Sequence, residues 1–319
     1  MEWLYYTYYN RCVFLPVSRV SFTVLKAIQY GTVNILKQLL QLGDKLPPKS
    51  IDKAAEYGQL AIIQWIHNHP SNQWRDNFSF TTVDATKQAI YHAAFHGRLD
   101  IVKWLYENRK EGCNEEAISA AASNGHLDIV KYLYQHNQPY NLDSILFLAA
   151  RHGHFPIIQW ACEMFSANFS MQSAFDGAIS SGFINIAKFV LPHTIRCTSE
   201  HFEQVASNGH LETLEWLYVT FPTISAGNAL IYAAKNGHLK TVIWISTLHP
   251  EAYCSKDAMN YAARYGHFDI VQWLYENRKE GCSEKAWEWS IENGHVDIVN
   301  WLESKQLLPK QLNCCQNNL

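Results

Sequence analysis

Apolar residues recur along this chain with the spacing of an α-helix, in short blocks that each follow a glycine. After Gly97, the segment from Leu99 to Leu105 has the sequence Leu-Asp-Ile-Val-Lys-Trp-Leu. Apolar positions three and four residues apart lie on one face of a helix, whereas a half-buried strand would alternate. The pattern therefore predicts a short amphipathic helix that starts about two residues after the glycine.

The blocks return at a nearly constant interval. Their glycines are Gly31, Gly58, Gly97, Gly125, Gly153, Gly182, Gly209, Gly237, Gly266 and Gly294. The intervals are 27, 39, 28, 28, 29, 27, 28, 29 and 28 residues, which indicates a period of about 28. The decapeptide from Trp104 to Cys113 also recurs letter for letter from Trp273 to Cys282. Such self-similarity indicates stacked repeats rather than one or two globular domains.

A second short helix is expected before each glycine. Several units carry an alanine pair four and three residues before it, at Ala54-Ala55, Ala93-Ala94, Ala121-Ala122, Ala149-Ala150, Ala233-Ala234 and Ala262-Ala263. Side chains this small let helices approach to or below the usual axis separation of ~8–10 Å. The glycine should then end the helix in a left-handed conformation that a Cβ would penalise.

Tryptophan forms a column at fixed register, seven residues after the repeat glycine. Seven of the eleven tryptophans stand there, at Trp65, Trp104, Trp160, Trp216, Trp244, Trp273 and Trp301. Because such large apolar side chains dominate core packing, we expect the column to lie in the core between repeats.

The segment Ala-Ala-x-x-Gly-His-Leu-Asp-Ile-Val-Lys, from Ala121 to Lys131, resembles the ankyrin repeat, and the resemblance covers roughly Val24 to Leu302. It implies an all-α fold, an ankyrin-like helical solenoid of about ten helix-turn-helix repeats. The Thr-Pro-Leu-His tetrapeptide of ankyrins is absent, and the period is about 28 rather than 33. We therefore expect short loops in place of β-hairpins. This Trp-rich variety is similar to ankyrin families of protists and giant viruses.

Three parts are expected along the chain. Residues 1–22 form an aromatic N-terminal segment and a candidate cap, residues 23–302 the repeat domain, and residues 303–319 a polar C-terminal tail. The interval between Gly58 and Gly97 exceeds the period by 11 residues, and polar, turn-prone residues fill it. It predicts an inserted loop at about 67–86.

Composition narrows the partner class. With 48% hydrophobic and 17% charged residues, the chain is too apolar to be disordered. A net charge of -3 provides no basic footprint for nucleic acid or anionic lipid, and no apolar run is long enough to span a membrane. Eight scattered cysteines favour reduced thiols. We expect a monomer in the cytoplasm by default, with the nucleus as the alternative.

Candidate chemistry is sparse. Six histidines directly follow repeat glycines, at His126, His154, His210, His238, His267 and His295. Neighbouring copies should lie about one repeat apart, ~9–10 Å, which is too far to share one zinc ion. A structural hydrogen bond in the turn is the better account. No phosphate-binding glycine loop, nucleophile elbow or His-Glu-x-x-His motif occurs. We expect no metal, no cofactor and no enzymatic activity.

The resemblance places the first helices on a concave face that binds a protein partner. Carried over by register, its exposed positions are His92, Phe95, His96, Arg151, His152, Tyr232, Lys235, Asn236, Tyr261, Arg264 and Tyr265. Aromatic and arginine side chains suit a recognition surface. The expected function is a non-enzymatic protein–protein interaction scaffold. The alternatives are a substrate adaptor in ubiquitin transfer, for which Leu15-Pro16 is the one F-box-like feature, and a family member without a selected partner.

Overall fold

The computed structural model describes residues 24–69, 86–113, 115–136, 140–165, 170–194, 196–225, 227–248 and 254–307. These residues are helical or in turns, with no strand among them. The chain divides into two compact units, unit 1 (residues 1–149) and unit 2 (residues 150–319), and each is described by itself. The expected N-terminal cap, residues 70–85 of the expected loop and the tail after residue 307 lie outside the described residues.

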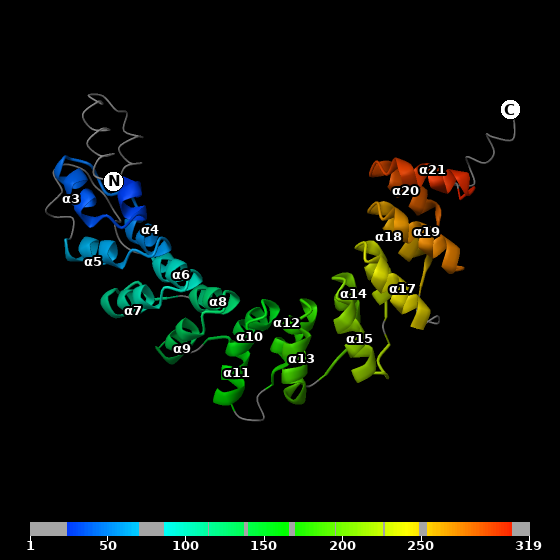
Figure 1. The fold of residues 1–319 in the computed structure, drawn as a ribbon, viewed down its shortest axis with the longest axis horizontal. Helices are drawn as coiled ribbons and strands as arrows, with labels where there is room; N and C mark the ends of the chain where they lie inside the picture. Colours follow the sequence, from blue (N-terminus) through cyan, green and yellow to red (C-terminus); the bar gives the residue numbers. More distant parts are fainter. Residues whose placement is uncertain are drawn as a thin grey trace. The chain divides into compact units, whose positions relative to one another are not determined.

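Unit 1 is a series of helix pairs, each with a first helix before the repeat glycine and a second helix after it (Figure 1). The earliest described helix comprises residues 24–29 and is a first helix. The following helices of unit 1, alternately second and first helices, are α3 (Val33–Gln41), α4 (Ser50–Glu56), α5 (Leu60–Asn68), α6 (Lys87–Phe95), α7 (Leu99–Asn108), α8 (Glu115–Ser123), α9 (Leu127–His136) and α10 (Leu142–Arg151). The last of these contains the boundary between the units.

Unit 2 continues the same alternation of first and second helices (Figure 1). Its elements are α11 (Phe155–Met164), α12 (Gln172–Ser180), α13 (Ile184–Val190), the 3₁₀ helix η2 (Leu191–His193), α14 (Ser199–Ser207), α15 (Leu211–Thr220), α16 (Ala229–Lys235), α17 (Leu239–Leu248), α18 (Lys256–Arg264), α19 (Phe268–Asn277), α20 (Glu284–Glu292) and α21 (Val296–Ser304). The all-α repeat architecture expected from the sequence is confirmed.

Each first helix ends in the same hydrogen-bonded turn. At Gly266, the glycine N–H donates to the Ala263 carbonyl at 3.3 Å, and the N–H of His267 donates to the Ala262 carbonyl at 2.9 Å. These two bonds define a Schellman motif, in which the alanine pair supplies both acceptors. Gly266 has a φ of +80°, as the sequence predicted for a left-handed C-terminal residue.

The first helices pack against each other in series. In unit 1, α4 contacts α6 and α6 contacts α8; in unit 2, α14, α16, α18 and α20 form the equivalent series. The alanine pairs lie at these contacts and are fully buried, as at Ala93, Ala94, Ala262 and Ala263. Small side chains therefore set the close approach of the first helices, as expected.

The tryptophan column differs from its expected burial. In the second helices, aliphatic side chains such as Ile101, Val102, Ile270 and Val271 are fully buried, whereas only Trp65 and Trp160 of the column are buried, with exposures of 9% and 7%. The other five tryptophans are half-buried. The column therefore lies at the edge of the core, where Trp104, Trp244 and Trp301 each contact a ring of the preceding second helix.

Aromatic pairs join successive second helices at that edge. The ring seven residues after one glycine contacts, edge to face, the ring nine residues after the preceding glycine. The pairs and their centroid separations are His67–Trp104 at 5.1 Å, Tyr106–Tyr132 at 5.9 Å, Tyr218–Trp244 at 5.1 Å and Tyr275–Trp301 at 5.1 Å. Such geometry contributes about 0.5–1.5 kcal/mol per pair beyond area burial.

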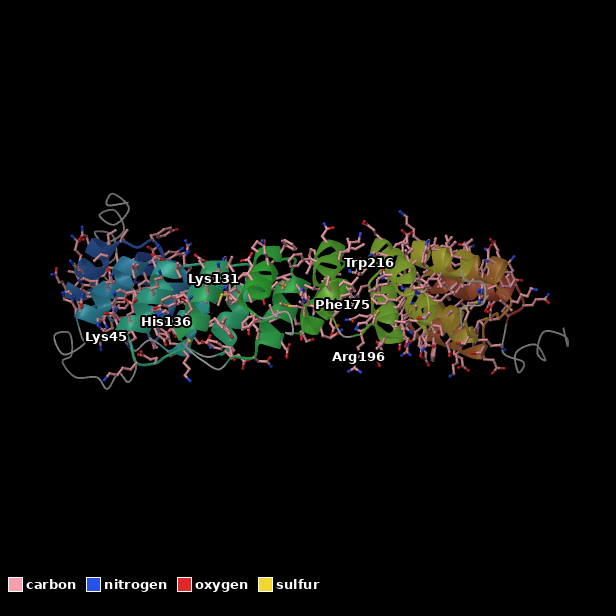
Figure 2. The ribbon with its side chains drawn as sticks, turned by 90° about the horizontal axis from the view of Figure 1, so that it is seen from below. Lys45, Lys131, His136, Phe175, Arg196 and Trp216 are labelled. Atoms are coloured by element: carbon pink, nitrogen blue, oxygen red, sulfur yellow. The ribbon has the colours of Figure 1, made fainter. Side chains whose placement is uncertain are left out.

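Phe175 is a fully buried ring of unit 2 (Figure 2). Its centroid lies 6.4 Å from that of Trp216 and 6.5 Å from that of Phe221, so it links α12 to α15 and the following connection. Arg196, in the connection before α14, is exposed and points away from the helices (Figure 2).

Two helices end near the expected boundaries. The inserted loop was expected at about 67–86, and the helices beside it are α5, which ends at Asn68, and α6, whose N-cap is Thr86. The polar tail was expected at residues 303–319, after a last helical turn, and α21 ends at Ser304. In both places the helical backbone extends past the last apolar position because its hydrogen bonds do not depend on side-chain polarity.

Candidate interaction surface

The histidines after the repeat glycines bond between repeats rather than within their own turn, which corrects the expectation from sequence. His295 Nε2 lies 3.0 Å from the carbonyl oxygen of Arg264, two residues before the preceding repeat glycine. Equivalent bonds join His126 to Phe95, His238 to Ser207 and His267 to Lys235. A carbonyl in the last turn of a helix has no partner in that helix, so each histidine caps the first helix of the repeat before it.

The imidazole also occupies the space that the glycine leaves. A Cβ on Gly266 would lie 2.6 Å from Cε1 of His295, and one on Gly97 would lie 2.6 Å from Cε1 of His126. Two independent reasons therefore favour glycine at this position. The backbone has a positive φ, and the ring of the next repeat occupies the space of a side chain.

Burial favours the neutral form of His210, one member of this column. Burial lowers the pKa of His210, and the neighbouring His238 lowers it further, while a hydrogen bond to the Ser180 backbone acts in the opposite direction. A neutral imidazole with its proton on Nε2 can still donate to the carbonyl, so the cap needs no charge.

A second set of hydrogen bonds joins a first helix to the N-cap of the first helix in the next repeat. The acceptor stands six residues before a repeat glycine, and the donor is the N-cap N–H. The links are Thr86 N–H to Asp52 Oδ1 at 2.9 Å, Asn228 N–H to Glu203 Oε1 at 2.8 Å, and Ser283 N–H to Asn260 Oδ1 at 2.9 Å. Thr86 Oγ1 also donates to Asp52 Oδ2 at 2.8 Å, so the buried carboxylate holds both groups.

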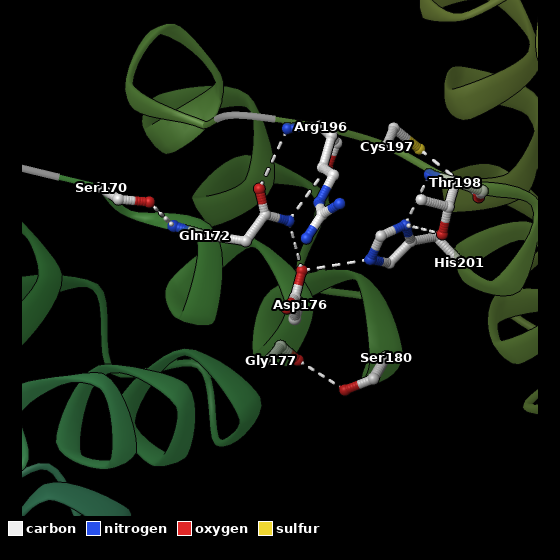
Figure 3. A network of polar contacts seen from close by, with 9 residues as sticks. All are labelled: Ser170, Gln172, Asp176, Gly177, Ser180, Arg196, Cys197, Thr198 and His201. Atoms are coloured by element: carbon white, nitrogen blue, oxygen red, sulfur yellow. Dashed lines mark hydrogen bonds and ion pairs between the residues drawn. The ribbon is translucent and has the colours of Figure 1, made fainter.

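At the equivalent position of α12, Asp176 belongs to a larger network (Figure 3). Gln172 Nε2 donates to Asp176 Oδ1 at 2.7 Å and to the Arg196 carbonyl at 3.0 Å. The Arg196 N–H donates to Gln172 Oε1 at 3.1 Å. The amide of Gln172 thus ties the connection before α14 to α12.

His201, in the first turn of α14, completes this network. Its Nε2 lies 3.2 Å from Asp176 Oδ1, and its Nδ1 accepts from the Thr198 N–H at 2.8 Å, as one arm of a capping box. The hydrogen bond to Asp176 raises the pKa of His201 to about 9, with Cys197 as the second contributor. The Thr198 N–H acts in the opposite direction, because it needs an unprotonated lone pair on Nδ1.

Cys197, His201 and Asp176 together do not form an activated thiol site. Both nitrogens of His201 are engaged by Thr198 and Asp176, and Cys197 Sγ contacts the Thr198 carbonyl at 3.9 Å. A base that activates a nucleophile must have a nitrogen available for the thiol proton. The arrangement caps a helix instead.

Burial favours the protonated form of three further cysteines. It raises the pKa of Cys254 to about 11 and also raises that of Cys162 and Cys282. The thiolate is the reactive form of cysteine, so these thiols are poor nucleophiles. Within the described ranges, no group of three or more His, Cys, Asp or Glu side chains is arranged to hold a metal ion.

In unit 1, the sequence-predicted surface residues gather on α6 and its C-cap. Phe95 and His96 are exposed, with ring centroids 5.0 Å apart, and His92 lies half-buried on the same helix. The Lys53 hydrogen bond holds the pKa of Glu56 below its usual range, and His92 and His96 add to this effect. Glu56 is therefore already paired within unit 1.

Arg151 and His152 stand at the C-terminal end of α10, where both are exposed. They occupy the first residues of unit 2, and the rings of His152 and His154 are stacked with centroids 6.4 Å apart.

The remaining predicted residues lie together on α16, α18 and their C-caps. Tyr232 is 37% exposed and Tyr265 47% exposed, while Lys235, Tyr261 and Arg264 are half-buried. Asn236 differs in role, because its Nδ2 donates to the Ser207 carbonyl at 3.0 Å and to Ser207 Oγ at 2.7 Å. It therefore holds α14 against α16.

Cations and rings alternate across this surface. Lys235 Nζ lies 5.7 Å from the ring centroids of both Tyr261 and Tyr265. The Arg264 guanidinium lies 5.8 Å from the Tyr265 ring and 4.8 Å from the Trp289 ring. The rings of Tyr261 and Trp289 are stacked with centroids 5.6 Å apart. We call Lys235, Tyr261, Arg264, Tyr265 and Trp289 the cation–aromatic ladder.

Sequence reasoning missed Trp289, which completes the ladder from α20. It stands five residues before Gly294, the register of Tyr232 and Tyr261 in the preceding repeats. Extending the register by one repeat would have identified it. The terminal position of that repeat obscured the signal.

The structure thus defines a helical repeat protein, with alanine-faced first helices, Gly-His turns and links from each repeat to the next. The sequence matches the family of ankyrin repeats (3 copies) over residues 51–144, 118–201, 202–285 and 230–313, which together span most of the chain. The chain belongs to the ankyrin repeat family.

One solved structure with a similar fold is the human ASB11 ankyrin repeat domain. The sequence identity is 18% and the TM-score is 0.40; the match covers 50% of this chain and 82% of that domain. No curated protein matches the sequence. No helix in the described part is long and apolar enough to cross a membrane.

Proposed function

We propose that this protein is a non-enzymatic interaction scaffold and that a protein partner binds the face formed by the first helices of unit 2, on the concave side that the resemblance implies. Ankyrin repeats are in general protein–protein interaction modules. The observation that carries the assignment to this face is the cation–aromatic ladder, because Tyr, Trp and Arg are the residues that dominate interface energetics.

The packing of the face also supports the proposal. The backbone beneath the ladder is held by Schellman turns and by the caps from His267 and His295 to the carbonyls of Lys235 and Arg264. A surface that is already ordered loses little conformational entropy on binding. The alternative of a ubiquitin-transfer adaptor depends on Leu15-Pro16, which lies outside the described residues.

Photo-crosslinking tests the face directly. A photoreactive phenylalanine analogue replaces Tyr261 in the full chain, and the matched control carries it at Tyr275, which lies on the second helix of the same repeat and is also partly exposed. In extract of the native cell, we expect the probe at 261 to give a specific protein adduct that the probe at 275 lacks. Equal adducts at both positions would contradict the proposal.

A second experiment measures whether substitutions on this face abolish binding of the partner. In a variant with Tyr232, Tyr261, Arg264 and Tyr265 changed to alanine, we expect the crosslinked partner to be lost from affinity capture. A variant with His92, Phe95 and His96 changed to alanine should retain it. Circular dichroism first establishes that both variants are folded. Retention of the partner by the first variant would remove this face from consideration.

A further inference from the structure

The cation–aromatic ladder has positive charge that no ion pair among the described residues neutralises. Lys235, Arg264 and the neighbouring Lys285, which lies 5.6 Å from the Trp289 ring, contact aromatic faces. None of the three forms an ion pair with a carboxylate of the described residues. By contrast, Arg278 pairs with Glu280 at 2.7 Å, so ion pairs do form elsewhere in unit 2.

The ring contacts leave the donors of these cations available. An ammonium has three N–H groups and a guanidinium has five, and a ring face engages the charge rather than each donor. A cation–π contact at an exposed site is weaker than a hydrogen bond to a charged group. A carboxylate therefore adds a stronger interaction without displacing the rings.

The acidic groups on the same helices limit what can bind. Asp257, Glu284, Glu288 and Glu292 are exposed on α18 and α20, so the helices that carry Arg264 and Trp289 also carry negative charge. A uniformly charged polyanion such as single-stranded nucleic acid would be repelled there. A peptide with separated carboxylates can place them on the cations alone.

The spacing of the repeats indicates which backbone conformation such a peptide would adopt. Lys235 and Arg264 occupy the same register on neighbouring first helices, whose axes lie ~8–10 Å apart. A polyproline II segment advances ~3.1 Å per residue and returns to the same face every three residues, about 9.3 Å. A β-strand returns every two residues, at ~6.6 Å, which is too short.

We propose that the cation–aromatic ladder binds an extended acidic segment of a partner protein, with carboxylates at positions i and i+3 that engage Lys235 and Arg264. Apolar residues between the carboxylates lie on the rings of Tyr261 and Trp289. The inference rests on the proposed scaffold function and adds the chemistry of the partner.

Fluorescence anisotropy with labelled peptides tests the inference on the full chain. The probe is a dodecapeptide with Glu at every third residue and Pro and Phe between; its controls have Gln in place of Glu, or Glu at every second residue. We expect saturable binding of the first peptide alone, weakened by salt. The double variant Lys235→Gln/Arg264→Gln should bind it at least about tenfold more weakly, as the loss of charge-assisted hydrogen bonds implies.

The matched protein control removes the same charge elsewhere. Lys240→Gln/Lys279→Gln alters two exposed lysines outside the ladder and should bind the probe as the wild type does. Equal binding of the Glu and Gln peptides, or equal weakening by both double variants, would overturn the inference. So would tighter binding of a dodecanucleotide or of phosphatidylserine vesicles through Lys235 and Arg264.

The two proposals fail in different ways. If the four-residue alanine variant loses its cellular partner while no acidic peptide binds, the scaffold face stands and the acidic segment is wrong. If the partner is retained by that variant, the face itself is wrong, whatever the peptides show.

Discussion

Each repeat glycine serves its own turn and the following repeat together. Its positive φ ends the first helix, and at Gly97, Gly182, Gly209, Gly237 and Gly266 the missing side chain also makes room for the imidazole of the next repeat. Gly294 separates the two effects. Its φ is +75°, but nothing lies within 4 Å of the position that a Cβ would occupy.

We expect Gly266→Ala to destabilise the protein more than Gly294→Ala does. A left-handed alanine costs about 1–2 kcal/mol at either position. At Gly266 the Cβ must also displace His295 and break its bond to Arg264, which adds about 1 kcal/mol. Urea unfolding followed by circular dichroism measures the difference in the free energy of unfolding.

A double-mutant cycle provides the control for this comparison. In a His295→Ala background the ring is absent, so Gly266→Ala should cost no more than Gly294→Ala. An unchanged penalty in that background would show that the imidazole is not what the glycine accommodates.

At the scale of elements, the links between repeats lie at helix ends. Histidines cap the C-termini of first helices, and acceptors such as Asp52 and Asn260 hold the N-caps of the next ones. Exposed end groups of a helix otherwise need water or a local side chain. Here each repeat supplies hydrogen-bond partners for the helix ends of its neighbours. A single repeat would therefore leave these backbone groups without their partners.

The N-terminus of α14 makes a pH-dependent contribution. Because Asp176 raises the pKa of His201 to about 9, above the unfolded value of about 6.5, protonated His201 favours the folded state. This stabilisation is fully present below about pH 6.5 and is lost as the pH rises through the folded-state value. In an NMR titration of the imidazole, we expect a midpoint clearly above 6.5.

Asp176→Asn removes the charge while keeping a similar shape. Its His201 midpoint should fall toward or below 6.5, and the stability difference from wild type should be largest in acid and vanish in alkali. A wild-type midpoint at or below 6.5 would mean that the Thr198 N–H, which needs an unprotonated Nδ1, outweighs Asp176.

At the scale of the whole molecule, the last described repeat lacks a neighbour among the described residues. Ile291 is 47% exposed there, although the equivalent residues of the other repeats, such as Ile179 and Ala263, are fully buried. Val296 is 63% exposed for the same reason. Burial in this chain is thus a property of the stack rather than of the single repeat.

The effects of substitutions should accordingly stay local. In a repeat protein each unit contacts only its neighbours, so stability is close to a sum of nearest-neighbour terms. We expect Gly266→Ala to increase amide hydrogen exchange in α18 to α21 and to leave α4 to α9 unchanged. A uniform increase across both units would instead indicate that the chain unfolds as one cooperative body.

The sequence by itself determined the repeat, the two helices of each unit, the left-handed glycine and the alanine packing. These features depend on contacts within a few residues, and their periods are visible in the aligned registers. The register also located most of the candidate surface, including Tyr261 and Arg264. The F-box-like Leu15-Pro16, the N-terminal cap and most of the inserted loop stay untested expectations.

Only the tertiary structure decided what the histidines bond to, how far the tryptophans are buried, and which cations meet which rings. The physical reason is distance along the chain. His295 caps a carbonyl 31 residues earlier, and Asn260 holds an N-cap 23 residues later. Such contacts depend on the stacking of one repeat on the next, which sets the register between helices and is invisible to any local pattern.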